Sequence, residues 1–429
     1  MSRISSVKYY FASWATVVVP LLLLVSTFTS SSSKVTTTTI AVTAFSPSSF
    51  SHILVRRGSG ASPNDGTSYK RFDCTPPMAR TSLYSSSTSD GVNGISNEHQ
   101  QKKDEKLLQD ILYRIRDNNN MPPSIQKSNV HFYVDGKFIG KIRPEIASKL
   151  RDIEVDLETL DEGIQQRPVF QLVQTDEEET SQKYLVFTQD VIPTFEGRTK
   201  AVSAVMDVLK NQGIIKGWRN EDYPVRASFY DPPMFVMERA AVQYLGVLEY
   251  GVHINGLVED KDNDGGGGKV KMWMARRAAN KSKFPGMLDH IVAGGQPAGI
   301  SLIDNCIKEC QEEAGIPEDI AKAGLKPVGL VSYENYIPQT ETISRVVLYN
   351  YDIMLPSTFV PKPVDGEVQE FFQWSVEEIL ESMDPEYHDP IKPNCYLVII
   401  DWLLREGHIS PDTPGYLDVF RELRSGDCQ

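Results

Sequence analysis

The sequence predicts a chain of mixed α and β structure, in which a β-sheet lies between helices and follows a small α+β domain. Two observations predict it. Short alternating or continuous apolar runs, typical of strands, occur within residues 130–142, 235–275 and 346–353. Apolar residues recur at helical spacing within 104–116, 199–211, 301–314 and 395–405. A mixed sheet with helices on both faces is the simplest architecture that buries all of these segments.

The N-terminal region reads as a leader. With 429 residues, the chain has room for two domains after it. Residues 1–44 are typical of a signal peptide, because Arg3 and Lys8 precede an apolar run at 14–25, which is shorter than the about twenty residues of a membrane span. Residues 45–103 are typical of a Ser/Thr-rich transit peptide followed by a disordered linker. The stretch 41–47 resembles the bipartite presequence of algae whose plastids are reached through the secretory route, with cleavage after Ala44. We therefore expect a plastid protein, with a mitochondrial or secretory leader as the alternative, and no stable membrane span after processing.

Charge and cysteine content narrow the classes of partner. The first 89 residues contain eight Lys or Arg and two Asp, while the whole chain has a net charge of −13. An acidic body argues against a nucleic-acid groove, whose affinity comes largely from neutralised phosphates. Five scattered cysteines give neither a disulfide framework nor a zinc-knuckle spacing.

The mature chain is predicted to contain two domains. Residues 104–231 form the small α+β domain, with a helix at 104–116, a hairpin at 130–142 that turns at Asp135-Gly136, and a helix at 199–211. Residues 232–410 form the sheet domain, whose last helix is expected at 395–405 with Asn394 as its N-cap; residues 411–429 are a tail. The acidic stretch at 260–265 resembles half of an EF-hand loop, but Lys271 occupies the position of the essential Glu, so we expect a hairpin tip and no calcium.

The most informative segment lies between Gly294 and residue 316. In a helix from Ser301, the side chains of Glu309, Glu312 and Glu313 stand at i, i+3 and i+4 and converge on one face. Leu302, Ile303, Cys306 and Cys310 are expected on the opposite, buried face. A cation among the three carboxylates would offset their repulsion, and oxygen ligands favour Mg²⁺, with Mn²⁺ as the alternative. We expect Gly294-Gly295 to make a tight turn beside the metal and Gly315 to end the helix.

This segment resembles the Nudix box, G-x5-E-x7-R-E-U-x-E-E-x-G-U, in which U is a bulky apolar residue. The chain matches in register at Gly294, Glu309, Cys310, Glu312, Glu313, Gly315 and Ile316. It departs at Ile300, where the box has its first Glu, and at Lys308, where it has an Arg. The resemblance implies a Nudix fold and a divalent-metal-dependent hydrolase of a small-molecule diphosphate.

Further stretches are similar to one Nudix subfamily, whose members carry an N-terminal thiamine-pyrophosphokinase-related domain. They lie at 134–144, 217–224, 275–289, 307–310, 365–371 and 392–395. The resemblance implies hydrolysis of thiamine diphosphate, preferably its oxidised oxo and oxy derivatives, to the monophosphate and phosphate.

Other residues receive roles in this interpretation. Glu313 or Glu367 is expected to accept the proton of the attacking water. The basic run of Arg276, Arg277, Lys281 and Lys283 is suited to clamping phosphate, although neighbours in a strand point to opposite faces. Trp273 either stacks on a substrate ring or packs in the core.

Two alternative functions remain. An isopentenyl-diphosphate-isomerase-like enzyme shares the approach to the glycine pair, but needs a Cys there, and residues 285–295 contain none. A non-catalytic diphosphate-binding or sensing module is motivated by Ile300 and Lys308. The three retained carboxylates argue against the second alternative.

Overall fold

The computed structural model describes residues 93–426 except 160–162, 176–181, 261–268 and 282. The predicted signal peptide and transit peptide, most of the EF-hand-like stretch and Cys428 lie outside the described residues. No helix within the described ranges combines the length and apolar character of a membrane span.

The N-terminal part is built on a small sheet with strand order β2-β1-β6-β5, in which β1 and β6 run parallel. The predicted hairpin is confirmed, with Asp135 and Gly136 both at positive φ in its turn. Helix α4 starts at Phe195, earlier than predicted, because Thr194 caps it by accepting a hydrogen bond from the Gly197 amide. The elements of this part are β1 (Val130–Val134), β2 (Lys137–Ile142), β3 (Glu154–Thr159), β4 (Gly163–Pro168), β5 (Phe170–Gln174), β6 (Lys183–Phe187), β7 (Asp222–Val225), β8 (Phe235–Glu238), α2 (Pro123–Ser128), α3 (Pro144–Asp152), α4 (Phe195–Asn211), the 3-10 helix Arg239–Ala241 and α5 (Val242–Leu245).

A larger mixed sheet follows, with strand order β11-β10-β9-β14-β13. Strand β9 pairs in parallel with β14 and antiparallel with β10 and β12, and β15 pairs with the other edge of β10. The elements of this part are β9 (Leu248–Asp260), β10 (Lys269–Arg277), β11 (Leu288–His290), β12 (Val292–Gly295), β13 (Leu325–Ile337), β14 (Thr342–Met354), β15 (Val368–Ser375), α6 (Leu302–Ala314), α7 (Glu318–Gly324), α8 (Val376–Glu381), α9 (Pro393–Arg405) and α10 (Tyr416–Glu422).

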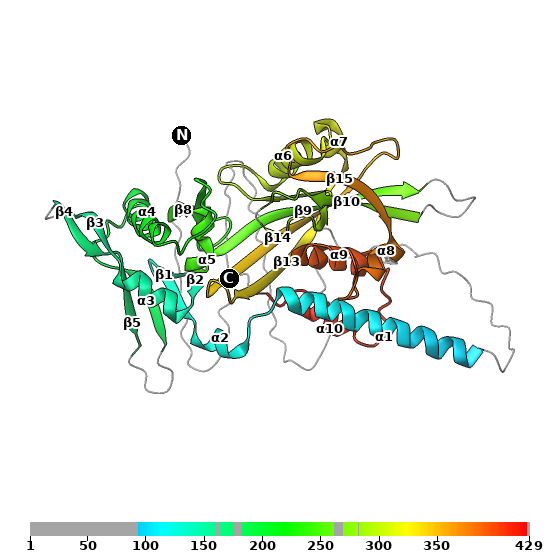
Figure 1. The fold of residues 1–429 in the computed structure, drawn as a ribbon, viewed down its shortest axis with the longest axis horizontal. Helices are drawn as coiled ribbons and strands as arrows, with labels where there is room; N and C mark the ends of the chain where they lie inside the picture. The colour runs from blue at the N-terminus through cyan, green and yellow to red at the C-terminus, as the bar shows by residue number, and fades with distance from the viewer. Residues whose placement is uncertain (1–92, 160–162, 176–181, 261–268, 282, 427–429) are drawn as a thin grey trace, which may run out of the picture. The chain divides into compact units, whose positions relative to one another are not determined.

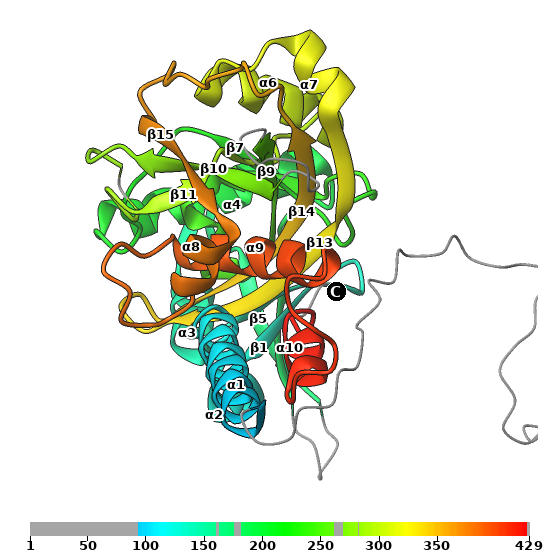
Figure 2. The ribbon, with the colours of Figure 1, turned by 90° about the vertical axis from the view of Figure 1, so that its right-hand side faces the viewer.

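Helices cover both faces of this sheet, as the predicted fold class requires (Figures 1 and 2). Helices α6 and α7 lie on one face, and α8 and α9 lie on the other. Each face has its own apolar core: Cys306 and Cys310 belong to the first, and Cys395 and Trp402 belong to the second. The sheet therefore separates α6 from α9.

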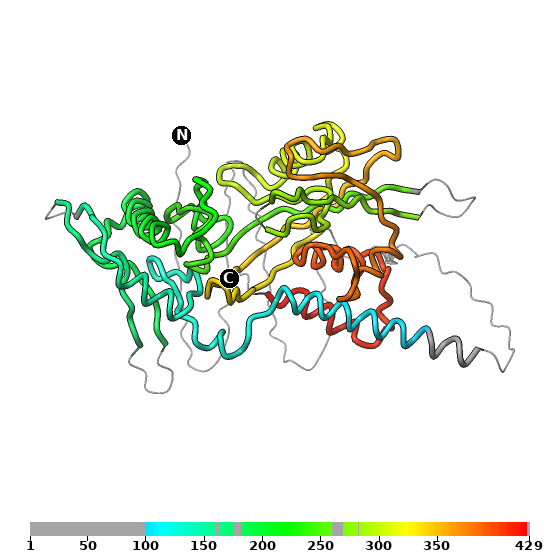
Figure 3. The backbone as a smooth tube through the Cα atoms, in the orientation of Figure 1, coloured from blue at the N-terminus to red at the C-terminus, as the bar shows by residue number. Residues whose placement is uncertain are grey.

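The long helix α1 (Asn93–Asn118) begins inside the segment that we expected to be a disordered linker. Its residues Leu108, Ile111, Leu112 and Ile115 are buried in the core beneath α9, and the helix packs against α9 and α10. Figure 3 shows α1 and the C-terminal α10 side by side. Helix α1 therefore packs with the large sheet, although the small α+β domain follows it in the sequence.

Packing also assigns the stretch after Asp231 to the N-terminal part. Strand β8 pairs with β7, and Phe235 to Val247 fall in the same core as Phe132 and Phe170. The boundary near 231 stays a prediction, and the change of core falls where β9 begins, at Leu248.

One capping prediction is wrong. Helix α9 begins at Pro393 with Lys392 as N-cap, and no side chain caps it. Proline at the first helical position has its φ already set and lacks an amide hydrogen that would need a partner, so Asn394 lies inside the first turn.

Candidate active site

Helix α6 carries the three predicted carboxylates and is closed at both ends by its own sequence. The Ser301 side chain accepts a hydrogen bond from the Asp304 amide, and Gly315 ends the helix with φ 62°. Cys306 and Cys310 are fully buried against the sheet, as expected. Ile303 is not on that buried face: it is 39% exposed, because the sheet contacts a narrower stripe of the helix than we expected.

The three carboxylates have different surroundings. The side chains of Glu309, Glu312 and Glu313 are 14%, 50% and 7% exposed. An oxygen of Glu313 accepts a hydrogen bond from the Ala293 amide of β12 at 3.1 Å. The Lys308 ammonium lies 3.2 Å from Glu309 and 2.6 Å from Glu312. Glu313 therefore points toward the sheet, while Glu309 and Glu312 share one lysine.

Gly294 and Gly295 do not form the expected tight turn. They are the last residues of β12 and pair with Val252 and Gly251 of β9. Their lack of a side chain matters for space: a Cβ on Gly294 would overlap the side chain of Glu309, and a Cβ on Gly295 would overlap the guanidinium of Arg239. Gly294 therefore lets the side chain of Glu309 lie directly over the strand, and Gly295 does the same for the guanidinium of Arg239.

Burial and neighbouring negative charges disfavour the ionised forms of Glu309 and Glu313 on α6. Burial raises the pKa of Glu309, and the charges of Glu312 and Glu367 raise it further, while Lys308 lowers it. Burial raises the pKa of Glu313 well above its ordinary value, partly offset by the Ala293 amide. Both carboxylates would be stabilised by a cation placed among them.

Glu367 lies near this group. Its charge raises the pKa of both Glu309 and Glu313, and its carboxylate is 2.5 Å from the ammonium of Lys281. The Ala278 amide donates to its carbonyl, which fixes the loop beside the end of β10. The structure thus brings Glu367 and Lys281 to the carboxylates of α6.

The two arginines predicted to bind phosphate, Arg276 and Arg277, form ion pairs within the protein. Arg276 bonds Asp389 with both terminal nitrogens, at 3.0 and 2.8 Å, and Glu370 with Nε. Arg277 donates to Asp289 at 2.7 Å and to the Lys283 carbonyl, while Lys283 itself is exposed. Trp273 is 6% exposed and packs in the core with Cys306 and Cys310, which is the second role that we allowed it.

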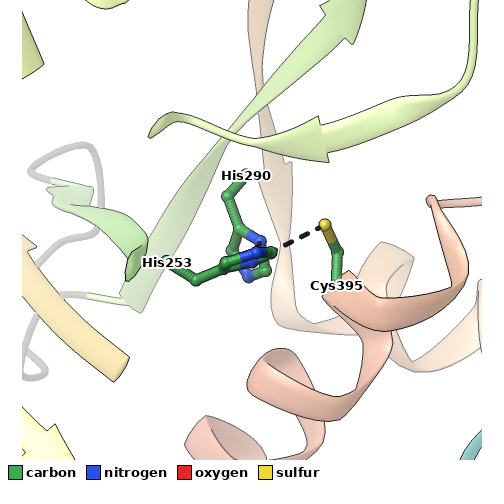
Figure 4. Close-up of side chains that lie close together, drawn as sticks. All are labelled: His253, His290 and Cys395. Carbon is green, nitrogen blue, oxygen red and sulfur yellow. Dashed lines mark hydrogen bonds between the residues drawn. The ribbon is translucent and has the colours of Figure 1, made fainter. Parts of the chain in front are cut away.

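A second group of ionisable side chains, which the sequence did not reveal, is buried across the sheet from α6. Asp289 of β11 accepts hydrogen bonds from Arg277 and Lys392 on Oδ2, and from the Cys395 thiol on Oδ1. His253 of β9 and His290 of β11 lie beside Cys395 (Figure 4). The available signal was an Asp-His pair inside an apolar strand and a Lys and a Cys at the start of an apolar helix.

Burial and neighbouring charges together set the pKa values in this buried group. Burial acts to raise the pKa of Asp289, but the charges of Lys392 and Arg277 outweigh it and hold that pKa well below its ordinary value. Burial lowers the pKa of His290 to about 4 and that of His253 well below its ordinary value. Burial also raises the pKa of the Cys395 thiol. At neutral pH the group therefore contains an ionised Asp289, two neutral imidazoles and a thiol.

Comparison with known proteins gives one family model and several curated relatives. Residues 110–249 match a family described as "Domain of unknown function (DUF4743)". The chain is 46% identical over 233 residues to Nudix hydrolase 24, chloroplastic, of Arabidopsis thaliana, covering 54% of this chain and 61% of that protein. It is 47% identical over 233 residues to Nudix hydrolase 20, chloroplastic, of the same plant, covering 54% of this chain and 59% of that protein. The matches thus span about three fifths of these relatives.

Among solved structures, the NUDIX domain of Shewanella oneidensis NrtR complexed with ADP ribose matches 37% of this chain and 87% of that chain. Its sequence identity is 12% and its TM-score is 0.28.

Proposed function

We propose that this chain, which belongs to the Nudix hydrolase superfamily, is a divalent-metal-dependent hydrolase of a small organic diphosphate. The observation that carries the proposal is the group of Glu309, Glu312 and Glu313 on α6, with Glu367 close by. The relatives' names support a plastid location, in agreement with the predicted bipartite presequence.

The side chains on α6 fit a hard divalent cation, Mg²⁺ or Mn²⁺. All three offer carboxylate oxygens, and burial and mutual repulsion raise the pKa of Glu309 and Glu313. Lys308 already places a positive charge between Glu309 and Glu312, which marks where a cation is favoured. When bound, the ion would neutralise phosphate oxygens and lower the pKa of the attacking water.

The reaction is attack of water on a phosphorus of the diphosphate. A bond forms between the water oxygen and phosphorus, the bridging O–P bond breaks, and a carboxylate accepts the water proton. Glu313, with its raised pKa, and Glu367, which is half-exposed, are the two candidates for this base. Lys281, which forms an ion pair with Glu367, is a cation beside one of these two candidates and could approach a phosphate oxygen.

We propose thiamine diphosphate, and especially its oxo and oxy derivatives, as the substrate. This rests on the stretches at 275–289, 365–371 and 392–395, which are similar to the thiamine diphosphate-hydrolysing subfamily. The N-terminal part would then be the thiamine-pyrophosphokinase-related domain of that subfamily.

Phosphate release from oxythiamine diphosphate by the purified protein with Mg²⁺ tests the proposal. Glu312→Gln should lower activity by about 10–100-fold or more. That is the loss typical when only the partner of a metal ligand is removed, and Glu312 is proposed to be a ligand itself. Glu318→Gln, an exposed carboxylate of α7 paired with Lys322, is the matched control and should leave activity unchanged. Unchanged activity in Glu312→Gln would contradict the metal site.

The same assay separates the alternatives. Turnover of other diphosphates but not of oxythiamine diphosphate would overturn the substrate and keep the chemistry. Binding without turnover of any diphosphate would favour the sensing module, and formation of an isomer from isopentenyl diphosphate would favour the isomerase. Of Glu313→Gln and Glu367→Gln, the variant that removes the base should lose about 10²–10⁴-fold in kcat together with the acidic limb of the pH profile.

A further inference from the structure

Three side chains that commonly bind transition metals meet inside the sheet domain. His253 comes from β9, His290 from β11 and Cys395 from the first turn of α9, and all three are buried. One ligand atom from each lies within 4.8 Å of the others. Figure 4 shows the two imidazole rings packed together, with the Cys395 sulfur directed at them.

The distances match those between ligands of a tetrahedral metal. Nδ1 of His253 is 3.1 Å from Nδ1 of His290 and 3.9 Å from Sγ of Cys395. With metal–nitrogen bonds of about 2.0–2.1 Å and a metal–sulfur bond of about 2.3 Å, tetrahedral ligand atoms lie roughly 3.3–3.7 Å apart. Small movements of the side chains would bring all three atoms to one ion.

The facing Nδ1 atoms of the two histidines are suited to one shared cation. Without an ion they can share only one proton, so one ring donates to the lone pair of the other. With an ion between them, both Nδ1 lone pairs are used, and each ring carries its proton on Nε2. Two imidazoles that face each other through Nδ1 beside a thiol therefore have the geometry of ligands.

Asp289 lies directly beside the three possible ligands. Its Oδ1 lies 2.8 Å from Sγ of Cys395 and 4.0 Å from Nδ1 of His290. Its Oδ2 is held by Arg277 and Lys392, each at 2.7 Å. Oδ1 also accepts a hydrogen bond from the His290 backbone amide at 2.9 Å. Both oxygens of Asp289 therefore have hydrogen-bond donors, and its carboxylate supports the side chains around it, as carboxylates next to metal ligands commonly do.

We propose that His253, His290 and Cys395 bind one divalent transition-metal ion of the Zn²⁺ class, separate from the cation on α6, with Asp289 as the carboxylate beside it. The mixed nitrogen and sulfur donors select a softer ion than the carboxylates of α6, which offer oxygen alone. Binding replaces the thiol proton: the S–H bond breaks, the sulfur–metal bond forms, and the proton leaves to solvent without any change of oxidation state. Because Arg277 and Lys392 already occupy Asp289, the thiolate charge of Cys395 is needed to balance the ion.

Cobalt substitution of the full-length protein tests this proposal. After treatment with a chelator, the native chain should bind one Co²⁺ at this site, with the visible bands of tetrahedral Co²⁺ and a near-ultraviolet thiolate-to-metal charge-transfer band. Zn²⁺ should displace these bands, and excess Mg²⁺ should not. Absence of the charge-transfer band from the native chain would overturn the proposal.

Matched variants identify the thiolate. Cys395→Ser should lose the charge-transfer band, whereas Cys310→Ala, a buried cysteine on the other face of the sheet, should keep it. A band that survives Cys395→Ser would overturn the assignment. If Cys395→Ser does not fold by circular dichroism, zinc-edge X-ray absorption of the native chain decides. One sulfur and two imidazoles around zinc support the site, and a shell of oxygen alone contradicts it.

Discussion

The protein contains carboxylates in two opposite electrostatic settings on the two faces of one sheet. On α6, Glu309, Glu312 and Glu313 stand together with a single lysine, and the pKa values of Glu309 and Glu313 are raised. On the other face, Asp289 is buried like Glu313 but has two cations of its own, and its pKa is lowered. The comparison teaches that burial alone does not determine the charge of a carboxylate. The balance of neighbouring charges decides it as well: the three carboxylates of α6 have one lysine among them, whereas Asp289 alone has two cations.

Removal of the Asp289 charge should have the largest effect on stability. Asp289→Asn leaves Lys392 and Arg277 without their buried counter-ion, and we expect it to lower the free energy of unfolding by about 3–5 kcal/mol. Urea denaturation at neutral pH, with a chelator present, measures this loss. Asp389→Asn is the control, because Asp389 pairs with Arg276 but is one-third exposed, and should cost below about 1 kcal/mol. Equal losses in both variants would show that the burial of the Asp289 pairs adds nothing.

Neutralising a carboxylate on α6 should raise the free energy of unfolding, in contrast to the loss expected for Asp289→Asn. The pKa of Glu313 is higher in the folded chain than its ordinary value of 4.5, so the folded state binds more protons and loses stability as pH rises above that value. Glu313→Gln removes this loss. Without divalent cations, its free energy of unfolding should exceed that of the native chain by about 1 kcal/mol or more near pH 8, equivalent to about 2–4 °C in Tm.

Two conditions serve as controls for this gain. It should vanish near pH 4, where Glu313 of the native chain is protonated in both states, and it should reverse with saturating Mg²⁺. Thermal melts across this pH range, with EDTA or with Mg²⁺, measure both. A variant less stable than the native chain at pH 8 in EDTA would contradict the account of Glu313.

Replacing Lys308, the lysine on α6, should have the smallest effect on stability. Lys308 is 45% exposed, so Lys308→Met should destabilise the metal-free chain by only about 0.5 kcal/mol, and 1 M NaCl should abolish the difference. Lys322→Met on α7 is the control, because Lys322 pairs with a single exposed carboxylate, Glu318. The loss for Lys308 should disappear on adding Mg²⁺ and the loss for Lys322 should not. Identical behaviour of the two lysines would argue against a shared cation position.

The sequence predicted the features that local chemistry determines. The hairpin turn at Asp135-Gly136, the helix between Ser301 and Gly315 and the spacing of the three glutamates all depend on residues within a few positions of each other. Strands β9, β10 and β14 were located for the same reason, because the apolar pattern along one segment reports its own burial. Strands β13 and β15 were not predicted.

Features that depend on distant segments were missed or misread. The role of Gly294 and Gly295 depends on Glu309 and Arg239, which reach them from other elements. Similarly, Asp289 meets Lys392 and Cys395 from more than 100 positions away, and no periodicity relates them. The predicted linker contained the start of α1, whose apolar stripe is satisfied only by the C-terminal helices.

The pairing of α1 with α10 has a consequence for the order of folding during synthesis. Arg116 on α1 forms a two-pronged ion pair with Glu422 on α10, and Arg114 donates to the carbonyls of Ser382, Met383 and Asp384. Helix α1 is thus synthesised well before the residues that it packs against, since Arg116 and Glu422 are 306 positions apart. Until α10 is synthesised, the apolar stripe of α1 lacks part of its native cover, so the second core can close only after that point.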